Sequence, residues 1–363
     1  MKLLIDIGHP AHVHLYRHFI REMKKRGHEF IVTVKDFLSA KQLLGKYAIP
    51  FRDIGGKSDS LAGKAARQFN YNRRLLRQVK DNSIDVGMGT SITVAHVSKM
   101  TAMKSVVFDD DDDAVEPIFS YLAHPFVDYL LSPDVLAGKR RKKRAVFYAG
   151  YHELAYLHPK RFTPDPSVLY EVGLTPGDKF FILRFNAFKA HHDAGILGIS
   201  LDDKRRLVNG LAKKGRVLIT MERELEPEFE PFRLNISPEK AHSLMYYSTM
   251  LVGDSQTMTS EAAVLGTPAM KCNSFAGRLT VPNELEIKYQ LCFAFSPSNV
   301  GRMFVKIDEL LAQEDLKAIW AERRDRMLKD KIDVTSFMVW FVENLPESAE
   351  IMRRDPDFHY QFK

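Results

Sequence analysis

The chain has 363 residues, of which 45% are hydrophobic and 27% are charged, a balance that excludes a largely disordered protein and suits two domains of ordinary size. Its two cysteines, Cys272 and Cys292, exclude a disulfide framework and a cysteine-rich zinc module. The formal net charge of +7 favours anionic partners such as nucleotides or an anionic membrane surface, whereas no motif of a nucleic-acid-binding module is present.

Short apolar runs alternate with helical patterns in the first third of the chain. Residues 2–7 form the first predicted strand, and this run is too short for a signal peptide because Asp6 interrupts it. A helix that ends near Gly27 follows the strand. Further strands are predicted at 30–34, 51–54, 84–89 and 105–109, and further helices at about 36–46, 60–80 and 91–101. This order predicts a parallel sheet with helices on both faces.

The alternation breaks between about 133 and 179 and then starts again. Strands are predicted at 180–185, 216–220, 250–254 and 268–272, and helices at about 201–214, 238–247 and 257–265. After about residue 297 the chain is predicted to be all-helical, and the amphipathic segment 337–345 is a candidate to pack across the first domain. We therefore predict two Rossmann-like domains, residues 1–165 and 166–345, and a tail, residues 346–363.

The break contains the densest basic run of the chain, residues 139–144. Two interpretations stay open: a solvated loop, or a surface that docks on an anionic membrane. No apolar stretch approaches the roughly 18 residues of a membrane span. The sequence thus predicts a cytoplasmic protein, with peripheral contact to the inner face of the membrane as an open alternative.

Ligands of parallel sheets bind beyond the carboxyl ends of the strands. After the first strand, Gly8 would let a ligand approach the backbone, His9 is a candidate substrate contact, and His12 is a candidate catalytic base or phosphate donor. The alternative for His12 is a histidine at a helix start whose ring forms hydrogen bonds only with the backbone. The GxGxxG fingerprint of nicotinamide cofactors is missing, and no carboxylate or cysteine fixes a metal geometry beside these histidines. We predict no cofactor and no metal.

Five aspartates, residues 109–113, begin at the last residue of the strand predicted at 105–109. They could bind a divalent cation, but adjacent side chains do not all point one way, so a solvated, helix-capping turn is the favoured interpretation. Asp110 is the member that we expect to face the site, as a second catalytic residue.

The second domain offers candidate nucleotide ligands after two of its strands. Arg184 can clamp a phosphate, and His191 and His192 in the following loop are candidate substrate contacts; a surface loop is the alternative. After the strand at 250–254, small polar residues crowd a predicted helix start, where amides and hydroxyls suit phosphate oxygens. The candidate nucleotide ligands there are Asp254, Ser255, Gln256, Thr257, Thr259 and Glu261. An ordinary helix cap is the alternative, but one cap does not need so many donors.

The stretch GDSQTMTSEAAVLGTPA resembles the nucleotide-diphosphate-binding segment of GT-B-fold glycosyltransferases and UDP-N-acetylglucosamine 2-epimerases, in its SGG-type turn, its acidic helix residue and its LGTP ending. The chain as a whole resembles the DUF354 family of that superfamily, through IDIGHPAHVHLYRHFIREMKKRGHE, YHELAYLHPKRFTPDP, LRFNAFKAHHDAG and YYSTMLVGDSQTMTSEAAVLGTPA. The resemblance implies a GT-B-like α/β fold, in which two Rossmann-like, doubly wound domains face an interdomain cleft and the second domain holds the nucleotide.

The resemblance also implies roles for single residues. Glu261 matches the ribose-binding acid, and residues 255–259 match the diphosphate turn. Gly8 and His12 match the glycine–histidine loop of MurG-like transferases, and Arg184 resembles the arginine in the His-Arg-x-x-Asn stretch of the epimerases.

Three departures count against epimerase chemistry. The SGG turn is Ser255-Gln256-Thr257 here, without glycines. The HGDT motif is residues 87–90, Gly-Met-Gly-Thr, without the acid that epimerisation uses, and the GluAlaGly stretch is replaced near the aspartate run.

The resemblance and the candidate sites together predict a metal-independent glycosyltransferase that uses a nucleotide-sugar, UDP-linked in the favoured version, as a substrate. Its acceptor would be a glycan or a lipid-linked glycan of polysaccharide or surface glycan biosynthesis. Two alternatives stay open: an epimerase or hydrolase of the nucleotide-sugar, and a protein that binds the nucleotide-sugar without turnover.

Overall fold

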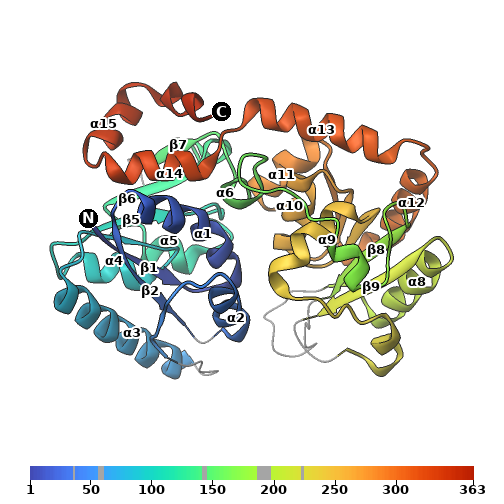
Figure 1. Ribbon diagram of the computed structural model, residues 1–363, viewed down its shortest axis with the longest axis horizontal. Coiled ribbons are helices and arrows are strands. Elements are labelled where there is room, and N and C mark those ends of the chain that lie inside the picture. Colours follow the sequence, from blue (N-terminus) through green and yellow to red (C-terminus); the bar gives the residue numbers. More distant parts are fainter. Residues whose placement is uncertain (36, 56–60, 141–144, 186–197, 222–224) are drawn as a thin grey trace. The chain divides into compact units, whose positions relative to one another are not determined.

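The computed structural model describes residues 1–35, 37–55, 61–140, 145–185, 198–221 and 225–363, with only the backbone for 61–67. The chain forms two compact units (Figure 1). Unit 1 comprises Met1–Arg161 and Lys331–Lys363, and unit 2 comprises Phe162–Asp330.

Unit 1 is built on a parallel sheet in the order β3-β2-β1-β4-β5-β6-β7. Its strands are β1 (Lys2–Ile7), β2 (Glu29–Val34), β3 (Arg52–Asp53), β4 (Val86–Met88), β5 (Lys104–Phe108), β6 (Tyr129–Pro133) and β7 (Val146–Tyr148). Its helices are α1 (Pro10–Lys25), α2 (Leu38–Lys46), α3 (Leu61–Asn82), α4 (Ile92–Ser98), α5 (Pro117–Leu122), α6 (Leu154–Leu157), α14 (Val334–Glu343) and α15 (Glu347–Arg354).

Unit 2 has a second parallel sheet, in the order β12-β11-β10-β8-β9. Its strands are β8 (Phe180–Phe185), β9 (Arg216–Met221), β10 (Met250–Gly253), β11 (Ala269–Cys272) and β12 (Cys292–Phe295). Its helices are α7 (Val168–Glu171), α8 (Leu201–Ala212), α9 (Ala241–Tyr247), α10 (Gln256–Leu265), α11 (Thr280–Ile287), α12 (Val300–Leu311) and α13 (Leu316–Asp330). The prediction of two parallel α/β sheets is confirmed.

The region that we predicted to break the alternation contributes two strands. β6 and β7 extend the sheet of unit 1, although both lie in or next to residues 133–179. These strands are short and fully or half buried, so neither shows the period-two pattern of an exposed strand. β12 was missed for the same reason. The all-helical prediction after residue 297 is confirmed by α12 to α15.

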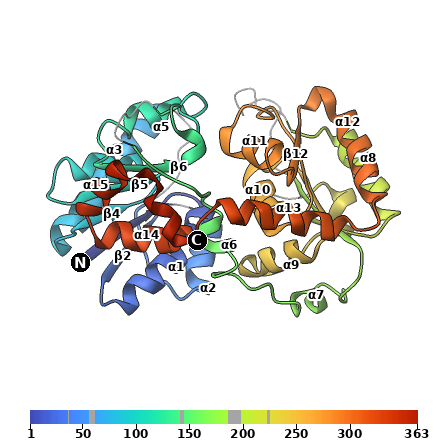
Figure 2. The ribbon, with the colours of Figure 1, turned by 90° about the horizontal axis from the view of Figure 1, so that it is seen from above.

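Residues 331–345, which we assigned to the second domain, belong to unit 1. Figures 1 and 2 show α14 beside α1. The ring of Phe337 lies 5.4 Å from that of Tyr148, and Thr335 Oγ1 donates to the carbonyl of Ala155 at 2.6 Å. The segment returns because its apolar face finds its partner in unit 1, as the amphipathic pattern had suggested. The units divide at 161/162 and 330/331 rather than at 165/166 and 345/346.

Gly253, the last residue of β10, is required by the packing of the sheet. A Cβ at this position would lie 2.0 Å from the carbonyl oxygen of Arg184 on β8. Because backbone cannot move away as a side chain does, we expect Gly253→Ala to lower the free energy of unfolding by roughly 1–3 kcal/mol in urea denaturation.

Gly210 in α8 is the matched control for that substitution. A Cβ there meets nothing within 4 Å. We expect Gly210→Ala to raise stability by about 0.5–1 kcal/mol, since alanine favours a helix interior over glycine. Equal effects of the two substitutions would contradict the close approach of β8 and β10.

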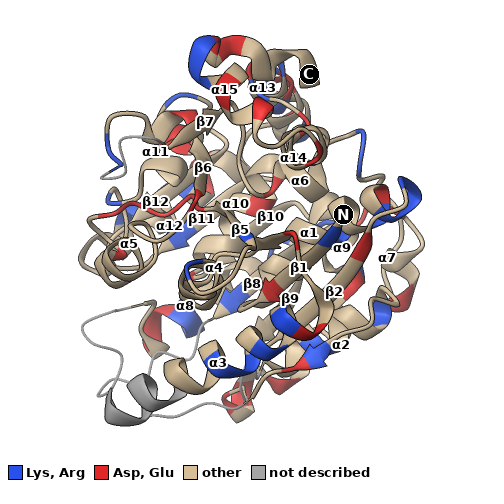
Figure 3. Cartoon of the chain, turned by 90° about the vertical axis from the view of Figure 1, so that its left-hand side faces the viewer, with Lys and Arg blue, Asp and Glu red and all other residues tan. Residues whose placement is uncertain are grey.

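Positive charge is distributed over the chain rather than gathered on one run. The second half of α3 carries Arg73, Arg74, Arg77 and Lys80 (Figure 3). Within the described part of the chain, no helix combines the length and the apolar character that crossing a membrane requires.

Candidate functional site

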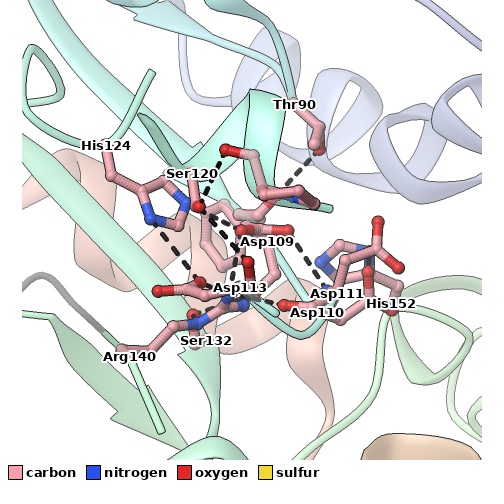
Figure 4. Close-up of polar contacts among 12 residues, drawn as sticks. Thr90, Asp109, Asp110, Asp111, Asp113, Ser120, His124, Ser132, Arg140 and His152 are labelled. Carbon is pink, nitrogen blue, oxygen red and sulfur yellow. Dashed lines mark hydrogen bonds and ion pairs between the residues drawn. The ribbon is translucent and has the colours of Figure 1, made fainter. Parts of the chain in front are cut away.

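A polar cluster of unit 1 lies beyond the carboxyl ends of β1, β5 and β7. Its centre is an ion pair between Asp110, which follows β5, and His152, which follows β7: Nδ1 of His152 lies 3.1 Å from Oδ1 of Asp110 (Figure 4). Burial raises the pKa of Asp110, but the charge and hydrogen bond of His152 outweigh it and leave that pKa below its ordinary value. Burial lowers the pKa of His152, but Asp110 raises it by more. Asp110 was predicted to face the site; the structure gives it an imidazole partner.

Three buried polar atoms beside this pair have no hydrogen-bond partner among the described residues. They are Nε2 of His152 and the hydroxyls of Tyr16 and Tyr148. Both phenol rings are fully buried, and the charge of Asp110 acts on both, so the pKa of each hydroxyl lies above its ordinary value. Native proteins rarely leave several such atoms unsatisfied in one place. A ligand or ordered water that supplies the missing partners would explain the cluster.

His12 belongs to the same cluster but differs from His152 in its hydrogen bonding. The backbone N–H of Gly8 donates to Nδ1 of His12 at 3.3 Å, so the proton of the neutral ring lies on Nε2. Burial, aided by His9, His152 and Lys35, lowers the pKa of His12 to about 3. His12 is therefore a neutral hydrogen-bond donor. The phosphate-donor alternative fits this geometry, whereas a base would need the lone pair that Gly8 already uses.

The other two predicted residues of this loop have local roles. His9 is the N-cap of α1, where its Nδ1 accepts from the N–H of Ala11 at 3.2 Å, and Pro10 occupies the first helical position. Its ring is exposed, so a substrate contact stays a prediction. A Cβ at Gly8 would meet only the His12 ring, at 3.9 Å, so this turn does not require glycine for space.

Two other aspartates of the run, Asp109 and Asp113, form a buried ion-pair cluster. Asp109 accepts from Nε2 of His124 at 2.8 Å, and the guanidinium of Arg140 lies 2.6 Å from Asp113 and 3.1 Å from Asp109 (Figure 4). Asp109, Asp113 and His124 lie close enough to ligate a cation, as do residues 109–111. In the first group Arg140 already supplies the positive charge.

Arg140 corrects one interpretation of the basic run. Its side chain is 2% exposed, so it is neither a solvated residue nor a membrane contact. Residues 141–144 lie outside the described part of the chain. The solvated, capping turn that we favoured for residues 109–113 is likewise wrong for Asp109 and Asp113. Both carboxylates are buried, and they pair with the guanidinium of Arg140 and the imidazole of His124.

The predicted nucleotide site of unit 2 lies at the first turn of α10. Ser255 is the N-cap, and its Oγ accepts from the N–H of Met258 at 3.4 Å. Thr259 is buried and its hydroxyl donates to the carbonyl of Ser255, so this hydroxyl serves the helix. Gln256 and Thr257 are half-buried, and their backbone amides belong to the orphan donors of the first turn. These two amides are available to an anion, and the first turn contains no acidic residue that would repel it.

Asp254 and Arg184 are placed on neighbouring strand ends by backbone pairing. The N–H of Asp254 donates to the carbonyl of Arg184 at 3.1 Å, and the Asp254 carbonyl accepts from Asn273 at 2.9 Å. The Asp254 side chain is buried, whereas Arg184 is half-buried and donates to Thr220 Oγ1 at 3.3 Å. Arg184 thus lies at the same sheet edge as the start of α10, with its guanidinium directed to Thr220 on β9, and its role as a phosphate clamp stays a prediction.

Glu261 is less available than predicted. Its carboxylate is buried and lies 3.0 Å from Nε2 of His242 on α9. This pair joins α9 to α10, and a ribose would have to compete with it. His191 and His192 lie outside the described residues.

Sequence reasoning missed His152, Tyr16 and Tyr148. Tyr16 lies on the buried face of α1, and the helical spacing of its apolar neighbours accounts for its ring but says nothing of its hydroxyl. His152 follows β7, a strand that we did not predict. The signal was available: a short apolar run, residues 146–148, stands immediately before it.

Known proteins resemble the chain over most of its length. The sequence profile of the family described as "Protein of unknown function (DUF354)" matches residues 1–339. Uncharacterized protein MJ0665 of Methanocaldococcus jannaschii is 23% identical over 283 residues, which cover 74% of this chain and 80% of that protein.

Solved structures share the architecture at low identity. UDP-GlcNAc 2-epimerase from Neisseria meningitidis, bound to UDP-GlcNAc, aligns with a TM-score of 0.65 and 13% identity over 98% of this chain and 99% of that chain. The glycotransferase of kitacinnamycin aligns with a TM-score of 0.59 and 13% identity over 94% of this chain and 98% of that chain. These likenesses concern the fold, and they confirm the predicted GT-B-like α/β class.

Proposed function

We propose that this chain, which belongs to the DUF354 family, is a nucleotide-sugar-dependent glycosyltransferase with a UDP-linked donor. The observation that carries the proposal is the first turn of α10: two orphan amides in a turn that contains no acidic residue, at the sheet edge that also carries Arg184. The fold is shared with proteins whose structures contain UDP-GlcNAc. A nucleoside diphosphate is the ligand that suits this turn best.

In the proposed reaction the two units supply different groups. The amides of Gln256 and Thr257 and the guanidinium of Arg184 bind the diphosphate and stabilise its charge as it departs, without need of a metal. In unit 1, Asp110 holds the proton of His152 on Nδ1 and leaves Nε2 to take a proton from an acceptor hydroxyl.

The atoms balance in a single displacement. The acceptor oxygen forms a bond to the anomeric carbon of the sugar, and the bond from that carbon to the diphosphate oxygen breaks. The hydroxyl proton goes to His152 Nε2, and the electron pair of the broken bond goes to the departing UDP. Nε2–H of His12 is a donor for a substrate oxygen.

Gly89 argues against epimerisation as the activity. This residue occupies the place of the acid in the HGDT motif, with φ at +142°. A Cβ there would lie 2.6 Å from the carbonyl oxygen of Asp6. A side chain at this position would collide with the backbone of β1. The acid could therefore not be restored by replacing Gly89 alone, because the path of the backbone differs as well.

The acceptor in this proposal is a glycan or a lipid-linked glycan of polysaccharide or surface glycan biosynthesis. The positive net charge favours acceptors presented on an anionic surface, and peripheral contact with such a membrane is part of the proposal.

A charge placed at the first turn of α10 tests the donor site. We expect Thr257→Asp to weaken UDP binding on the order of 100-fold in calorimetry, because a carboxylate there repels the diphosphate while it still favours the helix. Ser200→Asp is the matched control: it adds the same charge at the N-cap of α8, on the surface of unit 2. Equal UDP affinity of the two variants would exclude the first turn of α10 as the diphosphate-binding site.

Turnover separates the proposed reaction from its alternatives. The purified protein, given a panel of UDP-sugars with an acceptor extract, is expected to release UDP only when acceptor is present. Consumption of the UDP-sugar without acceptor would favour an epimerase or a hydrolase. Binding without turnover under every condition would favour a non-catalytic binding protein.

A further inference from the structure

A lysine occupies the third position of β11, in the interior of unit 2. β11 pairs with β10 on one side and β12 on the other, and all of its residues are buried. Lys271 itself is 2% exposed. A buried ammonium loses its hydration, so it normally has a carboxylate or several acceptors beside it.

Lys271 has neither. Its Nζ donates to Oε1 of Gln256, a neutral amide, and no carboxylate among the described residues forms an ion pair with it. An ammonium has three N–H donors, and one of them has an acceptor among the described residues. Glu286 acts on this charge from α11, but its Oε1 accepts from the backbone N–H of Ala294 at 3.0 Å. Burial lowers the pKa of Lys271 to about 8, so the cation still predominates at neutral pH.

Gln256 connects this cation to the first turn of α10. It is the first residue of the helix, and its Nε2 donates to Ser260 Oγ at 3.2 Å. A buried ammonium and a helix amino end therefore meet at one side chain. Both attract anions, and the hydrogen-bond acceptor that the described residues provide for the ammonium is the neutral amide oxygen of Gln256.

We propose that Lys271 is a phosphate-binding residue, and that the Gln256 carboxamide holds the place of a phosphate oxygen until a nucleoside diphosphate arrives. On binding, the flexible side chain of Gln256 moves aside and Nζ of Lys271 donates to the diphosphate. This inference rests on the proposed function and deepens it. It adds the full positive charge of Lys271 to the diphosphate site, from β11, a strand that the sequence analysis did not include in that site.

UDP and uridine are the probes that test the inference. We expect Lys271→Met, which keeps the volume of the side chain, to weaken UDP binding about 10- to 100-fold in calorimetry and to leave uridine binding unchanged, since uridine has no phosphate. Gln256→Ala keeps the backbone amide but removes the carboxamide that competes with phosphate for Lys271, so it is expected to bind UDP more tightly than the wild type. Lys213→Met, at the exposed end of α8, is the control for net charge and is expected to have no effect.

The outcomes separate this inference from the proposed function. If the wild type binds UDP and folded Lys271→Met binds it equally well, the inference is overturned and the proposed function stands. If the wild type binds neither UDP nor any UDP-sugar, both fail.

Proton uptake provides a second measurement on the wild type, which does not depend on the folding of a variant. Because burial lowers the pKa of Lys271 to about 8, a phosphate that binds its ammonium at pH 8.5 is expected to draw a proton to Nζ. The titratable groups that act on Lys271 are Glu286 and Cys292, and burial raises the pKa of the Cys292 thiol to about 12, so this thiol stays protonated. We expect UDP binding to be accompanied by proton uptake. Calorimetry in buffers of different ionisation enthalpy measures this uptake, because the observed binding enthalpy then varies with the buffer. Binding without proton uptake would overturn the inference.

Discussion

Replacing His152 by glutamine is expected to lower acceptor-dependent UDP release by roughly 100- to 10,000-fold. Nε2 of His152 has no partner in the described structure, and Asp110 holds Nδ1 at 3.1 Å, which is the arrangement of an oriented base. Glutamine retains a polar side chain but cannot accept a proton. UDP affinity is expected to stay unchanged, because the diphosphate ligands lie on unit 2. His96→Gln, on α4 of the same unit, is the matched control and is expected to keep full activity.

The pH dependence provides a readout that a merely structural role would not move. Burial lowers the pKa of His152, but the charge of Asp110, with Glu153 and Asp109, raises it above the ordinary value, and His12 faces it as a neutral ring. A base acts in its neutral form, so activity rises as the pH passes the pKa of His152. Asp110→Asn removes the largest raising charge, and the acidic limb of the pH–rate profile is expected to move to lower pH. A limb that does not move, or a fully active His152→Gln, would exclude His152 as the base.

The second large effect is expected in stability. Arg140→Met is expected to lower the free energy of unfolding by roughly 3–5 kcal/mol, because it leaves two buried carboxylates without their cation. The guanidinium lies 2.6 Å from Asp113 and 3.1 Å from Asp109, and its Nε donates to Ser132 Oγ at 2.9 Å. Urea denaturation followed by circular dichroism measures the loss.

Two further variants show whether the loss comes from the ion pairs. Lys139→Met removes a neighbouring positive charge from an exposed side chain and is expected to change stability little. Arg140→Lys keeps the charge but lacks the planar fork that reaches several acceptors, so its stability should lie between those of the wild type and Arg140→Met. An Arg140→Met protein as stable as the Lys139→Met protein would mean that the cluster contributes nothing.

The elements that sequence patterns predicted well are those whose signals are local. β1 and β8 are apolar runs of strand length, and α1 and α10 begin at side chains that cap their own helices. Because strand and helix alternate, the parallel sheets follow, and with them the edge at which polar residues gather. Local patterns alone therefore sufficed to place Gly8, His12, Arg184 and the α10 turn at strand ends.

The partners of these residues required the fold. Asp110 differs from Asp109 and Asp113 in which way its side chain points. The imidazole that it meets, His152, lies 42 positions further along the chain, just after β7, a strand without a clear pattern. Lys271 was invisible as a site residue because a lysine in an apolar strand shows neither its burial nor its contact with Gln256.

By itself, then, the sequence determined the two α/β sheets, their helix starts and the sheet edges that carry the candidate ligands, because capping, periodicity and turn chemistry act between near neighbours. Only the tertiary structure decided which aspartate pairs with a histidine, which are held by Arg140, and that the chain returns to unit 1 after residue 330. These depend on distances between residues far apart in the chain, and it is the packing of the whole unit that sets them.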